Sequence, residues 1–320
     1  IQLGYGLSAI SKPMLAIFIY PWWVFFSRTT DRLGKGIRTG ARDAMLSDEC
    51  NPETKGRVFG FHRSMDTLGA VFGPAIALIY LYFNPEHYQM LFIIAVVPGV
   101  LAIISTLFIK EFKKQVTKKK EIVQASLFAF TSYWKGSPAN YKKLVAGLLL
   151  FALINSSDIF LLLKMKESGQ SDTVIIGIYI FYNLVYAICA YPLGILADKI
   201  GLKSILITGL CIFSIVYTGF ALNENMYVFF LLFALYGIYA AATEGISKAW
   251  ISNLVPKNET ASALGTFSGF QSICALIASS LCGLLWYHLG AVFTFLVTAV
   301  ISLAVIIYLY FLKITDSPKP

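Results

Sequence analysis

The chain has 320 residues and a formal net charge of +9; 57% of its residues are hydrophobic and only 13% are charged. Soluble domains are closer to half apolar and about a quarter charged. This composition, with a mean hydropathy of +0.70, predicts a polytopic membrane protein. It also argues against nucleic-acid binding, because the basic residues concentrate in loops that alternate along the chain rather than on a soluble domain.

The cysteines and histidines form no recognisable site. Cys50 lies in a loop and the other four cysteines lie in apolar stretches, with no CxxC pair and no Cys/His cluster. Neither a Walker A sequence nor a nucleophile–base set is evident. We therefore expect no metal, no cofactor and no enzymatic activity. The sequence begins at Ile1 inside an apolar run without a signal peptide, and we interpret it as N-terminally incomplete.

Apolar stretches of about 20 residues predict membrane-crossing helices. The chain contains about ten of them, separated by short polar segments. They cover residues 3–20, 20–46, 57–83, 88–110, 142–165, 172–197, 203–222, 226–251, 261–287 and 291–313.

The loops between these spans alternate in charge. One set, residues 47–56, 110–142, 198–203 and 252–260, is polar and mostly basic, whereas the intervening loops are short and have few basic residues. Because basic loops stay in the cytoplasm, this pattern predicts that the first set and the C-terminus are cytoplasmic. The longest loop divides the chain into an N-terminal half-bundle (1–110), a linker (111–141) and a C-terminal half-bundle (142–320).

The linker carries a basic cluster and an aromatic cluster. The lysines are expected to face anionic lipid headgroups, and the aromatic residues to lay a short helix in the membrane interface. A solvated linker with a basic face is the alternative. The residues concerned are Lys113, Lys114, Lys118, Lys119, Lys120, Phe128, Phe130, Tyr133 and Trp134. We expect the protein to be a monomer.

A weak internal repeat links the two halves. Residues 53–66 (ETKGRVFGFHRSMD) resemble residues 259–272 (ETASALGTFSGFQS) if one gap is allowed, and each run follows a predicted cytoplasmic loop and begins a span. Such a repeat is typical of a duplicated transporter bundle. Chance similarity between two apolar helices is the alternative.

One motif points to a family. The run GILADKIGLK, residues 194–203, joins two spans through a tight turn and resembles the Gly-x-Leu-Ala-Asp-Arg-x-Gly-Arg-Lys signature of the major facilitator superfamily. Gly201 permits the turn and Asp198 can face a helix N-terminus or a nearby cation. The matching positions are Gly194, Leu196, Ala197, Asp198, Gly201 and Lys203, and Lys199 keeps the charge of the signature arginine.

Two further runs resemble motifs of this superfamily. Gly69, Gly73 and Pro74 resemble the Gly-Pro motif of its antiporters, and residues 28–34 resemble an Arg-x-x-Gln-Gly motif, with Asp31 and Arg32 at the positions of Gln and Gly. The dense basic run resembles an uncharacterised prokaryotic subgroup. The resemblance implies an all-α bundle of twelve helices, of which helices 3–12 are present here.

The span at 20–46 carries charges that are costly inside a bilayer. Arg28 is about 12 Å into its helix at 1.5 Å per residue, near the level where such transporters bind substrate. Gly34, Gly36 and Gly40 are expected to allow a close helix neighbour. For Lys35, Arg38, Arg42 and Asp43 we favour a salt-bridge lattice that locks the cytoplasmic side. For the deeper Arg28, Asp31, Arg32, Arg63 and Asp66, the lattice and a substrate or proton pathway are both open.

The second half supplies further candidates. Asp158, beside Asn155 and Ser156, is expected to lie within a helix without a nearby partner and to bind a proton reversibly; a structural hydrogen bond is the alternative. Tyr182 and Asn183 are placed along the same pathway, although a tyrosine stripe also fits simple packing. Glu244 and Lys248 are spaced to pair with each other, and we interpret them mainly as parts of the gate.

These observations predict a secondary active transporter of a small solute that works by alternating access. Proton coupling is expected from Asp31, Asp66 and Asp158, with antiport favoured. An uncoupled facilitator and a non-transporting receptor or scaffold on the same fold are the alternatives. The expected location is the plasma membrane of a prokaryote.

Overall fold

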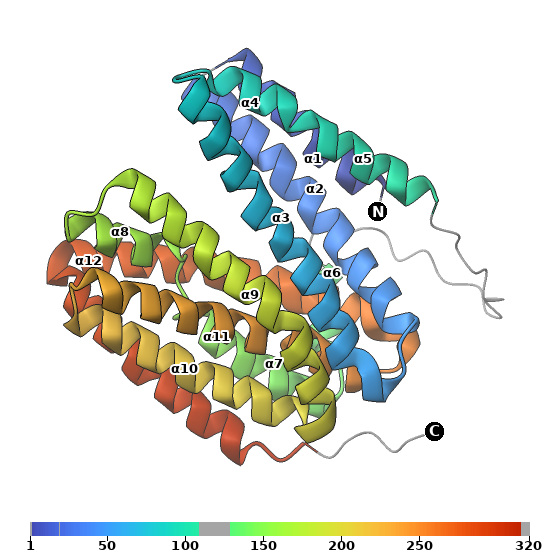
Figure 1. The fold of residues 1–320 in the computed structure, drawn as a ribbon. Helices are drawn as coiled ribbons and strands as arrows, with labels where there is room; N and C mark the ends of the chain where they lie inside the picture. The colour runs from blue at the N-terminus through green and yellow to red at the C-terminus, as the bar shows by residue number, and fades with distance from the viewer. Residues whose placement is uncertain (1, 19, 109–128, 315–320) are drawn as a thin grey trace.

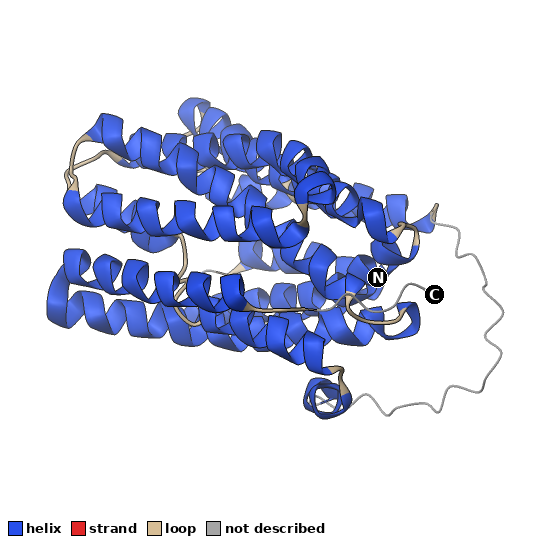
Figure 2. Ribbon diagram, turned by 90° about the horizontal axis from the view of Figure 1, so that it is seen from below, coloured by secondary structure: helices blue, strands red, loops and turns tan. Residues whose placement is uncertain are grey.

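The computed structural model describes residues 2–18, 20–108 and 129–314, which form helices and loops without a strand (Figure 2). The first part contains five helices: α1 (Gln2–Ile17), α2 (Pro21–Asp48), α3 (Lys55–Phe83), α4 (Tyr88–Ile94) and α5 (Val96–Leu107). The second part contains α6 (Ala129–Gly136), α7 (Ala139–Ala152), α8 (Ile159–Glu167), α9 (Asp172–Ile200), α10 (Leu202–Leu222), α11 (Met226–Asn253) and α12 (Thr260–Phe311).

Within the described ranges, six helical segments are long and apolar enough to cross a membrane. One of them, α12, is two helices joined at Gly290, whose backbone (φ 80°, ψ 170°) is not helical. This break confirms the predicted boundary between spans 261–287 and 291–313. Together with α1, the charged α2, and the α7–α8 pair, these segments correspond to the ten predicted spans.

The helices form two groups, α1–α5 and α7–α12, which meet where α3 lies beside α9 (Figure 1). The two helices are close together where α3 begins and α9 ends, and they diverge toward their other ends (Figure 1). The second group has a dense aromatic core in which Phe213, Tyr217, Phe220 and Phe233 are fully buried. The burial of large apolar side chains holds this group together.

Two predicted spans are broken rather than continuous. The span at 88–110 is interrupted at the single residue Ala95, between α4 and α5, where the backbone stays in the helical region (φ −64°, ψ −12°). Pro98 explains the interruption, because its ring clashes with the carbonyl of Ile94 and it donates no hydrogen bond. The span at 142–165 is interrupted between α7 and α8 by residues 153–158, which include two serines, an asparagine and an aspartate that compete for backbone hydrogen bonds.

The glycines of α2 have different surroundings. A Cβ on Gly34 would lie 2.6 Å from the carbonyl oxygen of Gly4, so α1 and α2 cross in backbone contact as predicted. A Cβ on Gly40 would lie 3.7 Å from the Cα of Gly265 on α12, an ordinary contact. Gly36 has nothing within 4 Å among the described residues.

The internal repeat has a structural counterpart. A short 3₁₀ turn precedes α3 (Pro52–Thr54) and another precedes α12 (Lys257–Glu259). The two similar sequence runs therefore occupy equivalent places at the beginning of a long helix, as expected for related halves.

Two aromatic residues of the linker, Tyr133 and Trp134, pack against other parts of the chain. The Tyr133 hydroxyl donates a hydrogen bond to Glu259 (3.1 Å), and the Trp134 ring packs edge-on against Tyr141 and Phe270. These contacts attach α6 to the second group, and its place in the membrane interface stays a prediction. The five linker lysines and Phe128, and the side chain of Phe130, lie outside the described part.

Candidate functional site

Small residues allow α3 and α9 to touch at one end of the molecule. A Cβ on Gly194 would lie 2.4 Å from the carbonyl oxygen of Gly56, and a Cβ on Gly60 would lie 2.5 Å from that of Ala190. Side chains of any larger size would force the helices apart. We call this end, which holds the predicted cytoplasmic loops, the closed end.

The motif at residues 194–203 fastens this end. Both carboxylate oxygens of Asp198 accept hydrogen bonds from the first turn of α3, one from the Gly56 amide (2.8 Å) and one from the Arg57 amide (2.7 Å). A carboxylate is favoured there by the partial positive charge of a helix N-terminus. The helix belongs to the other half, so Asp198 joins the two groups. Gly201 makes the following turn with a φ of +102°.

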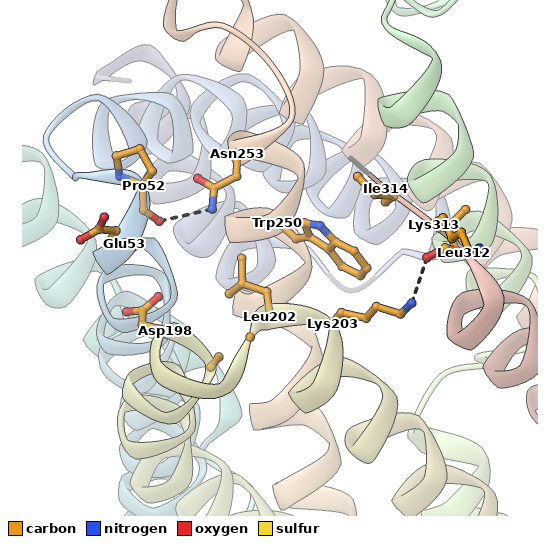
Figure 3. Close-up of a pocket in the computed structure, with 12 residues that line it drawn as sticks. Pro52, Glu53, Asp198, Leu202, Lys203, Trp250, Asn253, Leu312, Lys313 and Ile314 are labelled. Atoms are coloured by element: carbon orange, nitrogen blue, oxygen red, sulfur yellow. Dashed lines mark hydrogen bonds between the residues drawn. The ribbon is translucent and has the colours of Figure 1, made fainter. Parts of the chain in front are cut away.

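The remaining motif residues have different roles. Lys203 donates hydrogen bonds to the carbonyl oxygens of Tyr310 (2.8 Å) and Leu312 (2.9 Å) at the end of α12, where a cation is favourable. Lys199 is exposed. Lys203 also lines a cavity of about 520 Å³ at the closed end, where Asn253 donates to the carbonyl of Pro52 (Figure 3). Beside it the buried Lys55 donates to the carbonyl of Ser252 (2.8 Å).

Charged side chains form a second layer of contacts between the halves. Asp43 of α2, only 1% exposed, accepts from Lys248 of α11 at 2.6 Å and from Arg42 at 3.2 Å. Arg63 of α3 pairs with Glu244 of α11. Glu244 and Lys248 thus bind across the interface, and the alternative that they pair with each other is wrong.

Arg63 is the centre of a cluster. Besides Glu244, its guanidinium donates to Asp66 (2.9 Å) and to the hydroxyl of Tyr186 on α9. Two carboxylates from opposite halves therefore share one guanidinium. The predicted lattice extends between the halves rather than only within the first.

Two candidates on α2 face away from this interface. The Arg38 guanidinium lies 4.4 Å from the ring centroid of Tyr5 on α1, so it packs within the first half, and its place in the gate stays a prediction. Asp31 pairs with Lys12 of α1 at 3.6 Å. The sequence reasoning missed Lys12, although a lysine inside an apolar run is itself a signal of a buried partner.

Helical spacing relates the other cations of α2 to Asp43. Arg32 precedes Asp43 by eleven residues, close to three helical turns, so both lie on the face that Asp43 turns toward α11. Arg28 and Lys35 flank Arg32 on that face. Among the described residues, no carboxylate lies within 4.0 Å of these three cations, and all three are exposed. Lys35 is within electrostatic range of Arg63 and Asp66.

In the second half, Asp158 has a partner after all. It stands at the start of α8 and accepts a hydrogen bond from the hydroxyl of Tyr182 on α9. Asn155 donates to the Tyr239 hydroxyl at 3.0 Å, and Asn183 donates to the carbonyl of Tyr179 on its own helix. The helix break thus presents a buried polar cluster rather than an isolated carboxylate.

At the opposite end, which we call the open end, α3 and α9 separate (Figure 1). An apolar groove of about 330 Å³ lies between them, lined on one side by Pro74, Leu78 and neighbours on α3 and on the other by residues such as Tyr179 on α9. A Cβ added to Gly69 or to Gly73 would have no described atom within 4 Å. The molecule is therefore fastened at one end and parted at the other, as in an alternating-access membrane transporter.

The sequence matches the model of the Major Facilitator Superfamily over residues 1–181 and 159–320, and the chain belongs to this family. An uncharacterised MFS-type transporter of Methanocaldococcus jannaschii, MJ1317, is 35% identical over 311 residues, covering 95% of this chain and 75% of the relative. The protein Rv2265 of Mycobacterium tuberculosis is 23% identical over 271 residues, covering 83% of this chain and 64% of its own length.

Solved structures show the same fold. The human organic anion transporter MFSD10 has a TM-score of 0.77 at 13% identity, with 96% of this chain and 76% of that chain covered. The fucose:proton symporter FucP of E. coli has a TM-score of 0.73 at 13% identity, with coverages of 98% and 83%. At this identity the likeness establishes the all-helical fold and not the cargo.

Proposed function

We propose that this protein is a proton-coupled secondary transporter of a small anionic solute. The observation that carries the proposal is the cluster in which Arg63 of α3 binds Asp66 of its own helix and Glu244 of α11. Because the pair with Glu244 joins the two halves, a proton on Glu244 removes a contact that favours the closed end. Proton binding is thereby linked to the change of access.

In this proposal a proton competes with the Arg63 guanidinium for the carboxylates, because nearby cations favour the ionised form. Two carboxylates share one guanidinium, and Asp66 also lies within electrostatic range of Arg42, His62 and Lys35. Asp158, held by Tyr182 near the open end, is a second proton site in this proposal. Ionisable groups in such positions are typical of proton relays.

The anionic cargo is inferred from Arg28, Arg32 and Lys35. By helical spacing these cations share a broad face of α2 with Asp43, they have no carboxylate partner among the described residues, and an unpaired charge inside a membrane protein is costly. An anion between the halves offsets that cost. The solved structures of similar fold include both an organic anion transporter and a proton symporter, so either chemistry is compatible with this fold.

We favour antiport because Gly69, Gly73 and Pro74 match the Gly-Pro motif of superfamily antiporters. In this proposal the protein acts as a monomer in a prokaryotic plasma membrane, with the closed end, the central loop and the C-terminus in the cytoplasm. The linker lysines face anionic headgroups. Labelling of single cysteines from each side of right-side-out vesicles tests the orientation.

Transport is tested in proteoliposomes with an imposed pH gradient and an internal pH-sensitive dye. Organic anions that stabilise the protein against heat are added outside, and we expect proton movement that Glu244→Gln and Asp158→Asn both reduce. Asp172→Asn is the matched control, because Asp172 forms an exposed pair with Lys166. Cargo movement that does not depend on the pH gradient and is unchanged by both substitutions indicates an uncoupled facilitator. No movement of any stabilising anion indicates a receptor or scaffold.

A further inference from the structure

The groove at the open end has an unusual lining for a path taken by ions. Seven of its eight lining residues are Pro, Ala, Leu or Ile, and the eighth is a tyrosine; α3 contributes Pro74, Ala77, Leu78 and Leu81, and α8 and α9 contribute Leu162, Ile175, Ile176 and Tyr179. Its volume of about 330 Å³ is at the lower end of the range for small-molecule pockets. Such a lining stabilises an apolar body and leaves a hydrophilic ion without a partner.

The groove begins at the level of the unpaired arginines. Positions along the helix axes can be compared from the closed end toward the open end. Lys248 and Glu244 are one turn apart on α11, so Arg63, the partner of Glu244, lies about 6 Å nearer the open end than Asp43, the partner of Lys248. Arg28 is fifteen residues before Asp43, or about 22 Å toward the open end. Pro74 is eleven residues beyond Arg63, which places it at about the same 22 Å.

The inner end of the groove is aromatic. The Tyr179 ring meets the Tyr182 ring edge-on with centroids 5.3 Å apart, and the Tyr182 hydroxyl binds Asp158. Asp158 repels an anionic group from this wall. The cations of α2 on the other side attract it, because Asp31, the acidic residue among them, is engaged by Lys12.

We infer that the cargo is an amphiphilic organic anion, with its anionic head bound by Arg28 and Arg32 and its apolar body in the groove between α3 and α9. This inference rests on the proposed function and names the substrate class of the same pathway. The charge of the α2 face and the uncharged groove are complementary to the two ends of such a molecule. A hydrophilic anion can use only the first of them.

Three probes separate the two contributions: octane-1-sulfonate, methanesulfonate and octylammonium. The protein in nanodiscs is heated with each probe, and the unfolding temperature is followed by tryptophan fluorescence. We expect octane-1-sulfonate to bind about tenfold or more tightly than methanesulfonate because its chain leaves water, and octylammonium not to stabilise the protein. Equal effects of the two sulfonates overturn the inference and leave a hydrophilic-anion transporter intact. Equal effects of the two octyl compounds indicate partitioning into lipid only and also overturn it.

Variants locate the two ends of the probe. Ala77→Trp fills the groove and is expected to remove the preference for octane-1-sulfonate while methanesulfonate still binds; Leu78→Gln tests the same wall with less change in volume. Arg32→Gln is expected to weaken both sulfonates. Val300→Trp on the exposed face of α12 is the control for an added tryptophan and is expected to behave as the parent protein. A preference that survives both groove variants means that the octyl chain binds outside the groove and overturns the inference. The comparison of probes on the parent protein decides the inference even where a variant does not fold.

Discussion

The carboxylate of Asp43 on α2 and the ammonium group of Lys248 on α11 are 2.6 Å apart, and this pair joins the two halves of the molecule. Asp43 is 1% exposed, and its other oxygen accepts from Arg42. A buried carboxylate needs such partners, because its desolvation is not offset by water. The pair is therefore a contact that exists only while the closed end is closed.

Lys248→Met is expected to weaken the closed end. Breaking a buried pair from one side costs about 3–5 kcal/mol, and the cost should be at the low end here because Arg42 remains. The native Cys50, 5% exposed at the closed end, reports the change, since its alkylation rate should rise several-fold as the end opens. Lys199→Met removes an exposed lysine from the same end and should leave the rate unchanged. Equal rates in the two variants would contradict a latching role for the pair.

Gly194→Val is expected to prevent closure by a different route. A Cβ at this position would lie 2.4 Å from the Gly56 carbonyl oxygen, so α3 and α9 must separate. Overpacking of this kind costs about 1–3 kcal/mol or more. Gly177→Val on the same helix is the matched control, because a Cβ there meets no described atom within 4 Å. The measurement is the distance between spin labels placed on the two halves at the closed end, which should lengthen only in Gly194→Val.

Much of the architecture was predictable because lipid imposes simple rules on sequence. Apolar length predicted the spans, and Gly201 makes the tight turn that the motif predicted. The breaks before Ile159 and at Ala95 were missed because hydropathy does not register local backbone competition. Pro98 was the available signal for the second of them.

The pairing of charges could not be read from spacing alone. Glu244 and Lys248 satisfy the rule for a pair within one helix, but they bind residues 181 and 205 positions away, respectively. Arg38 and Asp31 share a helix with Asp43 but face α1, where Arg38 contacts the Tyr5 ring and Asp31 pairs with Lys12. Which face of α2 meets which neighbour depends on the packing of three helices, and a single sequence does not state it.

Cys50 is expected to react slowly with N-ethylmaleimide near neutral pH. Burial raises the pKa of its thiol above the ordinary 9.0, and the nearby Lys55 only partly opposes this. The closed state thus holds the thiol proton more tightly than an open state does, so this thiol favours closure at pH below 9 and stops favouring it as the pH rises further. Alkylation of the folded protein should therefore begin at higher pH than that of the protein in SDS, followed by mass spectrometry of the residue 50 peptide. Coincident pH profiles would contradict burial of this thiol in solution.

Tyr182 and Asp158 are expected to be energetically coupled. The hydroxyl of Tyr182 donates to Asp158, and Tyr182 is buried. A hydrogen bond to a charged group contributes about 1.5–3 kcal/mol, so Tyr182→Phe should destabilise the protein. In a double-mutant cycle with Asp158→Asn, the two effects should be non-additive by about 1 kcal/mol or more, because each variant removes the same bond.

The exposed pair Lys166–Asp172 provides the control cycle, with side chains that are 53% and 77% exposed. Solvent screens such a pair, and its coupling should be below about 1 kcal/mol. Tyr179→Phe is a second control, because it removes a neighbouring hydroxyl and leaves the bond to Asp158 in place. The free energies come from denaturant titrations in mixed micelles. Additive effects for Tyr182 and Asp158 would mean that the carboxylate at the start of α8 is held by other groups, and that the break between α7 and α8 does not depend on α9.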